Sequence, residues 1–138
     1  MKTAKKTLAV LLTVCCIMGL LTSAHATQAQ AEPRIDTSSS AYASLKISSV
    51  GEATCKAAVI AKSLSYRIEI NMSICRVIND IPDPLKSWGS TGVYSLDLTK
   101  QYYLSKGYDY QVIVAITVRD SSGKLIESFI ISSSIVHY

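Results

Sequence analysis

The chain has little of the chemistry that most enzymes use. Its 138 residues include only two histidines and four cysteines. One histidine, His137, lies next to the end of the sequence, where chains are usually loosely ordered. Catalysis by a serine or cysteine nucleophile needs a histidine held by a third group, and a structural zinc site needs several histidine or cysteine ligands. We therefore predict no catalytic residue, no metal site and no cofactor.

Patterns for binding phosphates and nucleic acids are missing as well. The six glycines do not cluster as a phosphate-binding loop requires. The formal net charge of +4 arises mainly from three lysines within the first six residues, and without them it falls to about +1. A nucleic-acid partner requires several neutralised phosphates. The remaining charge is too small and too dispersed for that, so we expect no nucleic-acid partner.

The first 26 residues have the order of a cleavable secretory signal. The lysines are followed by an apolar run from Leu8 to Leu21 and by the triplet Ala24-His25-Ala26. The run is short for a membrane span, which takes about 20 residues. We predict cleavage after Ala26 and a secreted, extracellular product with no membrane span after processing. A second cleavage site at 29–31 and an uncleaved membrane anchor are the alternatives.

A change in the composition and periodicity of the sequence indicates the domain boundaries. Residues 27–40 are polar and show no periodicity, which is typical of a flexible leader. From residue 41 to residue 138 the sequence consists of short β-rich runs separated by turn residues. In the clearest run, 66–76, apolar residues at every second position alternate with polar ones, which indicates a strand buried on one face. Further runs lie at 42–48, 53–61, 86–88, 93–98, 108–118 and 124–131, with a loop at 79–84 that contains two prolines.

About seven short strands with regularly spaced turns predict an all-β fold. We expect a two-sheet antiparallel sandwich of the immunoglobulin-like kind. The segment 104–118 resembles the sixth strand of fibronectin type III and immunoglobulin-like domains. In those domains a tyrosine near the start of the strand bonds back to the preceding corner. The resemblance implies that Tyr108 or Tyr110 makes this bond.

Three stretches of the sequence resemble one family. They are ATCKAAVI at 53–60, RIEINMSI at 67–74, and a stretch that runs from KSW at 86–88 to GYDYQV at 107–112. Together they resemble a family of small secreted proteins of clostridia and related Gram-positive bacteria, which has no assigned function. The resemblance covers about residues 42–134 and implies a fold but no activity. Cys75 departs from the family pattern, which has a polar residue there.

Two cysteines remain after the signal, Cys55 and Cys75. An oxidising extracellular setting favours a disulfide between them. Cys55 shares a strand face with Ala57 and Val59, which points it into the core. Strict alternation after Ile74 points Cys75 outward, so the disulfide requires a bulge near Cys75.

Trp88, Tyr103 and Ile113 form the candidate binding surface. Aromatic side chains on a sandwich can stack on sugars or anchor a protein partner. Trp88 could instead pack inward over the open edge of the sandwich. Ile113 lies on the outward face of its strand and would belong to an apolar patch if Ile126 or Ile130 lay beside it. The leader or a neighbouring loop could cover this patch instead.

These observations predict a secreted, non-catalytic binding or adhesion module. Its expected partner is an unidentified protein or glycan. A structural or inhibitory factor is the first alternative, and a hydrolase the second. A hydrolase would have to use Asp80, Asp83 or His137, but aspartates beside prolines are more simply explained as turn residues.

Overall fold

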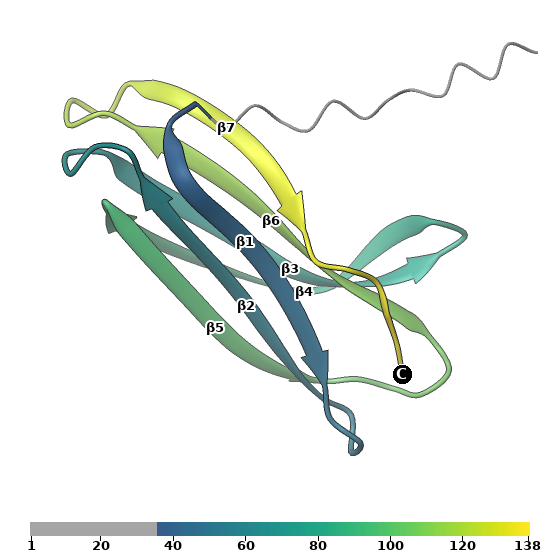
Figure 1. Cartoon of the computed structure of the whole chain (residues 1–138). Helices are drawn as coiled ribbons and strands as arrows, with labels where there is room; N and C mark the ends of the chain where they lie inside the picture. The colour runs from purple at the N-terminus through teal and green to yellow at the C-terminus, as the bar shows by residue number, and fades with distance from the viewer. Residues whose placement is uncertain (1–35) are drawn as a thin grey trace, which may run out of the picture. The chain divides into compact units, whose positions relative to one another are not determined.

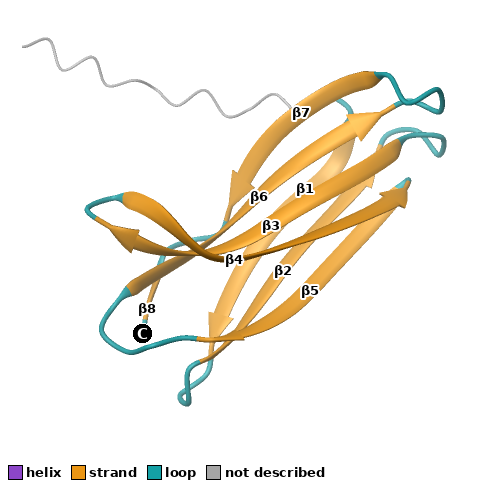
Figure 2. Cartoon of the chain, turned by 180° about the vertical axis from the view of Figure 1, so that it is seen from behind, coloured by secondary structure: helices purple, strands orange, loops and turns teal. Residues whose placement is uncertain are grey.

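A computed structural model describes residues 36–138. The predicted signal, its cleavage site at Ala26 and most of the predicted leader lie outside the described residues. All regular elements between residues 36 and 138 are strands (Figure 2), and no helix there is long and apolar enough to cross a membrane. In chain order the strands are β1 (Ser38–Ile47), β2 (Glu52–Ala61), β3 (Arg67–Ile78), β4 (Ile81–Val93), β5 (Ser95–Tyr103), β6 (Asp109–Arg119), β7 (Leu125–Ser132) and β8 (Val136–His137).

The strands form two layers (Figure 1). One is a three-stranded sheet in the order β1-β2-β5, and the other is a five-stranded sheet in the order β4-β3-β6-β7 with β8 paired to β6. All pairings are antiparallel. The chain crosses between the sheets after β2, β4 and β5, as in immunoglobulin-like sandwiches. The predicted all-β sandwich is therefore confirmed.

The core lies between the two sheets and follows from the alternation of the sequence. Every second residue of each central strand points inward, and at these positions the side chains are apolar and almost completely buried. β2 contributes Cys55, Ala57 and Val59, β3 contributes Ile68, Ile70, Met72 and Ile74, and β6 contributes Val112, Val114, Ile116 and Val118. The strand predicted at 66–76 has this inward face.

Tyr110 fixes the corner between β5 and β6. Its side chain is only 2% exposed, and its hydroxyl donates a hydrogen bond to the Ser105 carbonyl oxygen at 2.7 Å. A buried hydroxyl needs such a partner, and here the partner lies five residues upstream in the crossover. Tyr108 is 43% exposed and does not make this bond. The structure therefore selects Tyr110 from the two tyrosines implied by the resemblance.

The first strand begins earlier than the sequence pattern indicates. β1 starts at Ser38, so residues 38–40 belong to the sandwich and not to the leader. Thr37 and Ser38 are buried, and the Thr37 amide donates a hydrogen bond to the Glu127 carboxylate of β7 at 3.0 Å. The Thr37 hydroxyl donates to the same carboxylate. This segment is ordered by a long-range contact, which a local pattern could not reveal.

The predicted loop at 79–84 is a β-hairpin that extends beyond the sandwich (Figures 1 and 2). Asn79 and Asp80 form its two-residue turn with φ of 51° and 63°, as a type I′ turn requires. Pro82 and Pro84 lie in β4, which is an edge strand. Proline is tolerated there because the edge of a sheet leaves some amides without a ladder partner.

The predicted disulfide is wrong, because Cys55 and Cys75 are both free thiols. Cys55 points into the core from β2 in the three-stranded sheet. Cys75 lies on β3 in the other sheet, directly after the core residue Ile74, and it is 3% exposed but outside the core cluster. The bulge beside Cys75 does occur, but it shifts the register of β3 with β4 and not with β6. Cys75 therefore stays on the face opposite to the core.

Candidate functional site

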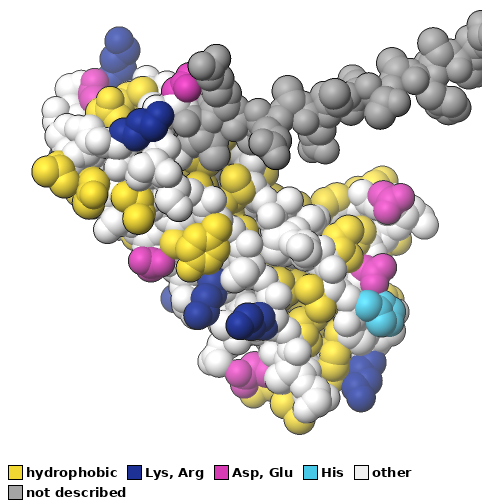
Figure 3. All heavy atoms as spheres, in the orientation of Figure 1, with side chains coloured by type: hydrophobic (Ala, Val, Ile, Leu, Met, Phe, Trp, Pro, Cys, Tyr) yellow, Lys and Arg dark blue, Asp and Glu magenta, His cyan; other side chains and the backbone are white. Residues whose placement is uncertain are grey.

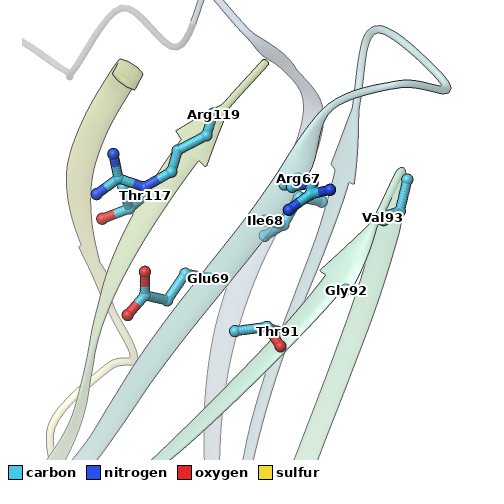
Figure 4. A pocket seen from close by; sticks show the side chains of 8 residues that line it. All are labelled: Arg67, Ile68, Glu69, Thr91, Gly92, Val93, Thr117 and Arg119. Carbon is cyan, nitrogen blue, oxygen red and sulfur yellow. The ribbon is translucent and has the colours of Figure 1, made fainter. Parts of the chain in front are cut away.

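The outer face of the five-stranded sheet has a hollow of about 460 Å³. Its volume lies within the usual range of ligand pockets, about 300–1,000 Å³. Three adjacent strands supply its walls, as Figure 4 shows. The lining residues are Arg67, Ile68 and Glu69 of β3, Thr91, Gly92 and Val93 of β4, and Thr117 and Arg119 of β6. We call this feature the outer-face hollow.

Strand register explains why these side chains meet. Arg67 and Glu69 flank the core residue Ile68 on β3, so both point away from the core. Arg119 of β6 lies opposite Arg67, and Thr117 lies opposite Glu69. On the other side, β4 places its own residues opposite the same two positions, with Val93 opposite Arg67 and Thr91 opposite Glu69. The hollow is therefore built from two neighbouring rows of the sheet.

A glycine leaves the outer face next to the hollow without a side chain. Gly89 of β4 lies opposite Asn71, one row beyond Glu69 on the same face. The only atom near the position of an added Cβ would be the Ile70 carbonyl oxygen at 3.8 Å. Nothing in the local packing thus requires glycine there, and its small size leaves the outer face open.

The charged groups of the outer-face hollow are free to meet a ligand. Within residues 36–138, no ion pair joins Glu69 to Arg67 or Arg119. Arg119 donates a hydrogen bond from Nη1 to the Gly123 carbonyl oxygen at 3.3 Å, which uses one of its donors. The hollow therefore presents two cations, one carboxylate and two threonine hydroxyls.

An apolar step adjoins the hollow on the same face. Ala115 of β6 lies opposite Ile130 of β7, whose side chain is 63% exposed. Ile113 lies one row further along, opposite Ser132, and is half-buried. The apolar patch predicted around Ile113 thus exists, with Ile130 as its neighbour across the strands. We call Ala115 and Ile130 the apolar step.

The opposite face of the molecule is different in character. Figure 3 views the molecule from the side of β1, β2 and β5, where hydrophobic side chains lie scattered among polar and charged ones. On the outer face of this sheet Lys56 of β2 lies between Ser44 and Thr99, and the next row contains Ala58, Tyr42 and Asp97.

Trp88 does not belong to an exposed surface. It lies opposite the core residue Met72 on the edge strand β4, and it is half-buried against the core. Its ring stands at 73° to that of Tyr102 on β5, with 6.4 Å between the centroids. Inward packing of Trp88 over the open edge of the sandwich, the alternative to a binding role, is therefore confirmed.

Tyr103 is exposed but lies apart from the other candidate residues. It ends β5 in the three-stranded sheet, is 71% exposed, and donates a hydrogen bond from its hydroxyl to Glu52 Oε2 at 3.1 Å. This bond, together with the negative charge of Glu52, raises the pKa of Tyr103. The three predicted residues Trp88, Tyr103 and Ile113 thus do not form one surface, and only Ile113 lies on the face of the hollow.

The residues considered for hydrolysis lie in separate places. His137 Nδ1 lies 2.6 Å from Asp109 Oδ1, and both side chains are mostly exposed. Asp83 pairs with Arg76 at 3.4 Å, and Asp80 lies in the hairpin turn. No group of three or more metal-ligating side chains occurs between residues 36 and 138.

Sequence reasoning missed Arg67, Glu69 and Arg119. Their outward parity is visible in the run 66–76 and directly after the run 108–118, but their contact depends on the pairing of β3 with β6. The third and sixth strands are neighbours in an immunoglobulin-like sandwich, so this signal could have been used.

The site belongs to an immunoglobulin-like sandwich with a polar hollow on its larger sheet. No protein-family model and no curated protein matches the chain. The resemblance to the clostridial family stays a prediction.

Proposed function

We propose that the protein is a secreted, non-catalytic binding or adhesion module that binds its partner on the outer face of the five-stranded sheet. The observation that carries the proposal is the outer-face hollow, in which three strands present charged groups that do not pair with one another. Side chains on paired strands are held more precisely than side chains on loops. The backbone of a binding site built in this way needs little rearrangement when the partner arrives.

The apolar step extends this surface. Ile130 and Ala115 are exposed directly beside the polar hollow. A surface that combines a desolvatable apolar part with a few convergent polar groups is typical of recognition sites. Export, which the N-terminal residues predict, would bring this surface into contact with proteins or glycans outside the cell.

A hydrolase is less well supported. His137 and Asp109 lie at the opposite end of β6 from Arg119, so the hollow cannot bring a substrate to them. Both side chains are more than half exposed, at 72% and 51%. A catalytic histidine needs an oriented and protected setting, which such an exposed pair does not supply.

The proposal can be tested with two matched substitutions of alanine by arginine. Ala115→Arg places a long side chain on the apolar step beside the hollow. Ala58→Arg makes the same change on the outer face of β2 in the other sheet. The readout is binding of the secreted protein to an array of immobilised glycans and peptides, with circular dichroism as the check of folding.

We expect Ala115→Arg to weaken binding to the recognised probes by at least about tenfold, because it blocks a surface that must be desolvated. Ala58→Arg should bind like the unsubstituted protein. Equal binding by all three proteins, or a loss confined to Ala58→Arg, would show that the partner binds elsewhere. Failure of the unsubstituted protein to bind any probe would also count against the proposal.

A further inference from the structure

Two arginines occupy directly opposed strand positions in the outer-face hollow. Arg67 and Arg119 are partners in the register of β3 and β6. Side chains at such positions have Cβ atoms about 4.5–5.5 Å apart, and like charges there destabilise the pair. Figure 4 shows the two guanidinium groups pointing apart, which lowers their repulsion. Neither forms an ion pair within residues 36–138. An anion bound between them would offset the repulsion further.

An anion between the arginines would find suitable donors. A guanidinium group carries five N–H donors and binds a carboxylate through two parallel hydrogen bonds. The Arg67 side chain is exposed, and exposed side chains change rotamer within nanoseconds, so its guanidinium can turn toward a ligand. Arg119 is half-buried, and its guanidinium donates from Nη1 to the Gly123 carbonyl oxygen, which leaves its other donors available.

The next row of the sheet limits which anion fits. Glu69 lies beside the arginine pair, opposite Thr117 on β6 and Thr91 on β4. Its carboxylate repels a second negative charge at this row, so only one carboxylate of a ligand can lie in the hollow, but it accepts hydrogen bonds from hydroxyl groups. The Thr91 hydroxyl can donate and accept, while the Thr117 hydroxyl already shares a hydrogen bond with the Ser128 hydroxyl at 3.5 Å. The two rows together suit a sugar unit with one carboxylate and adjacent hydroxyls.

Other anionic ligands fit less well. The lining contains no aromatic ring on which a nucleobase could stack, and phosphate chains would bring charge against Glu69. An acidic peptide would supply the carboxylate but not the row of hydroxyls. A carboxylated sugar supplies both within one ring.

We propose that the outer-face hollow binds a carboxylated sugar of the uronic acid type, with Arg67 and Arg119 on the carboxylate and Glu69 on the hydroxyls. The inference rests on the proposed function, since it names the ligand class of the same surface. It commits to a glycan and leaves an acidic peptide as an outcome of the test.

The test uses trigalacturonate as the probe and isothermal titration calorimetry as the readout, with maltotriose and triglutamate for comparison. The double variant Arg67→Gln/Arg119→Gln removes the two cations of the hollow. Lys46→Gln/Lys56→Gln removes two cations from the outer face of the other sheet and is the matched control. Glu69→Ala removes the acceptor of the hydroxyl contacts and tests them separately.

We expect trigalacturonate to bind the unsubstituted protein and the lysine control alike, and to bind the arginine variant at least about tenfold more weakly. Binding should weaken with added salt, because exposed charges are screened. Glu69→Ala should weaken binding of trigalacturonate several-fold, because alanine has no acceptor for the sugar hydroxyls. Binding of maltotriose or triglutamate as tight as that of trigalacturonate would overturn the sugar assignment, as would full binding by the arginine variant or none by the unsubstituted protein.

The two proposals fail in different ways. If Ala115→Arg abolishes array binding while trigalacturonate does not bind, the surface stands and the sugar class is wrong. If Ala115→Arg changes nothing on the array, the surface itself is wrong. The thermal midpoint of each variant, measured alongside, separates lost binding from lost folding.

Discussion

Tyr110 shows how much one side chain can determine in this sandwich. Its ring is buried in the core, and its hydroxyl satisfies the Ser105 carbonyl in the crossover from β5 to β6. Removing the hydroxyl leaves that carbonyl without its partner. We predict that Tyr110→Phe lowers the free energy of unfolding by about 1–2 kcal/mol.

Urea denaturation measures this difference, and Tyr108→Phe is the matched control. The Tyr108 ring, 43% exposed, lies 5.0 Å from the Arg76 guanidinium, and phenylalanine keeps a ring for this contact. The control should therefore change stability by less than about 0.5 kcal/mol. Equal effects of the two substitutions would contradict the role assigned to Tyr110.

Glu127 is the second side chain whose effect can be measured alone. Partial burial is the largest single effect and raises its pKa, but hydrogen bonds from the Thr37 hydroxyl and from the amides of Thr37 and Asp36, together with the charge of Lys62, outweigh it. The net result is a lowered pKa. A lowered folded-state pKa adds stability above the ordinary glutamate value, about 4.3, and this stability is lost as pH falls through the folded value.

We therefore predict that Glu127→Gln lowers the free energy of unfolding at pH 7. The free energy of unfolding of this variant should also fall less steeply as the pH is lowered into the acid range. Urea denaturation at several pH values from neutral to acid tests this. Thr37→Val removes one donor to the carboxylate and should reduce the pH dependence of the free energy of unfolding in the same range to a smaller extent. A variant curve that runs parallel to that of the unsubstituted protein would refute the assignment.

At the scale of the elements, the β3–β4 hairpin depends on its turn. Asn79 and Asp80 both have positive φ, which costs a residue with a side chain about 1 kcal/mol or more. Asn-Gly is the pair that best fits a type I′ turn. We predict that Asp80→Gly raises the free energy of unfolding by up to about 1 kcal/mol. Asp80→Ala should lower it, because alanine has neither the freedom of glycine nor the local hydrogen bonds of aspartate. Thermal unfolding of the two variants gives the sign, and a loss of stability with glycine would contradict the turn assignment.

Elements with a strong local pattern could be predicted from the sequence. Alternation in the runs at 53–61, 66–76 and 108–118 indicated β2, β3 and β6, whose inner faces form most of the core. For β4 the sequence predicts only a short edge strand at 86–88, because Pro82 and Pro84 favour a loop. β8 was missed altogether. It has two residues and is defined by pairing with Asp109 and Tyr110 of β6.

The candidate site could be predicted less well than the fold. The alternation of side chains along a strand correctly places Ile113 on the outward face. It could not show that Trp88 packs inward at the edge or that Tyr103 lies on the other sheet. Arg67 and Arg119 are 52 residues apart in sequence, and only strand register makes them neighbours. Local periodicity tells which face a side chain occupies, whereas a site also needs the order of the strands.

At the scale of the whole molecule, the sandwich is held together without a cross-link. A domain of about 100 residues can bury enough apolar surface to fold without a disulfide. The two thiols lie on different sheets, and burial raises the pKa of Cys55 to about 11. Burial, followed by the charge of Asp83, also raises the pKa of Cys75. Both thiols are therefore protonated and slow to react near neutral pH.

We predict that the purified protein has the same mass with and without reductant. Iodoacetamide at pH 8 should alkylate Cys55 slowly in the native state, and both thiols quickly after unfolding in urea. A gain of two hydrogens on reduction would show a disulfide and contradict the separation of the two cysteines. Rapid native alkylation at Cys55 would contradict its place in the core.

The two faces of the molecule differ in what they offer a partner. The outer face of the five-stranded sheet combines the hollow with the apolar step, whereas the other face has single lysines among small polar residues and scattered apolar ones such as Tyr42. This asymmetry is a property of the whole sandwich, because it arises from the outward residues of four strands and from the order in which these strands pair.

The most direct test is to map binding residue by residue. Amide resonances of the isotope-labelled protein would be recorded during a titration with trigalacturonate. The largest shifts should fall on β3, β4 and β6 around Arg67, Glu69, Thr91 and Arg119, with little change on β1, β2 and β5. Shifts confined to the three-stranded sheet or to the β3–β4 hairpin, or no shifts at millimolar ligand, would contradict the assignment of the outer-face hollow as the binding site.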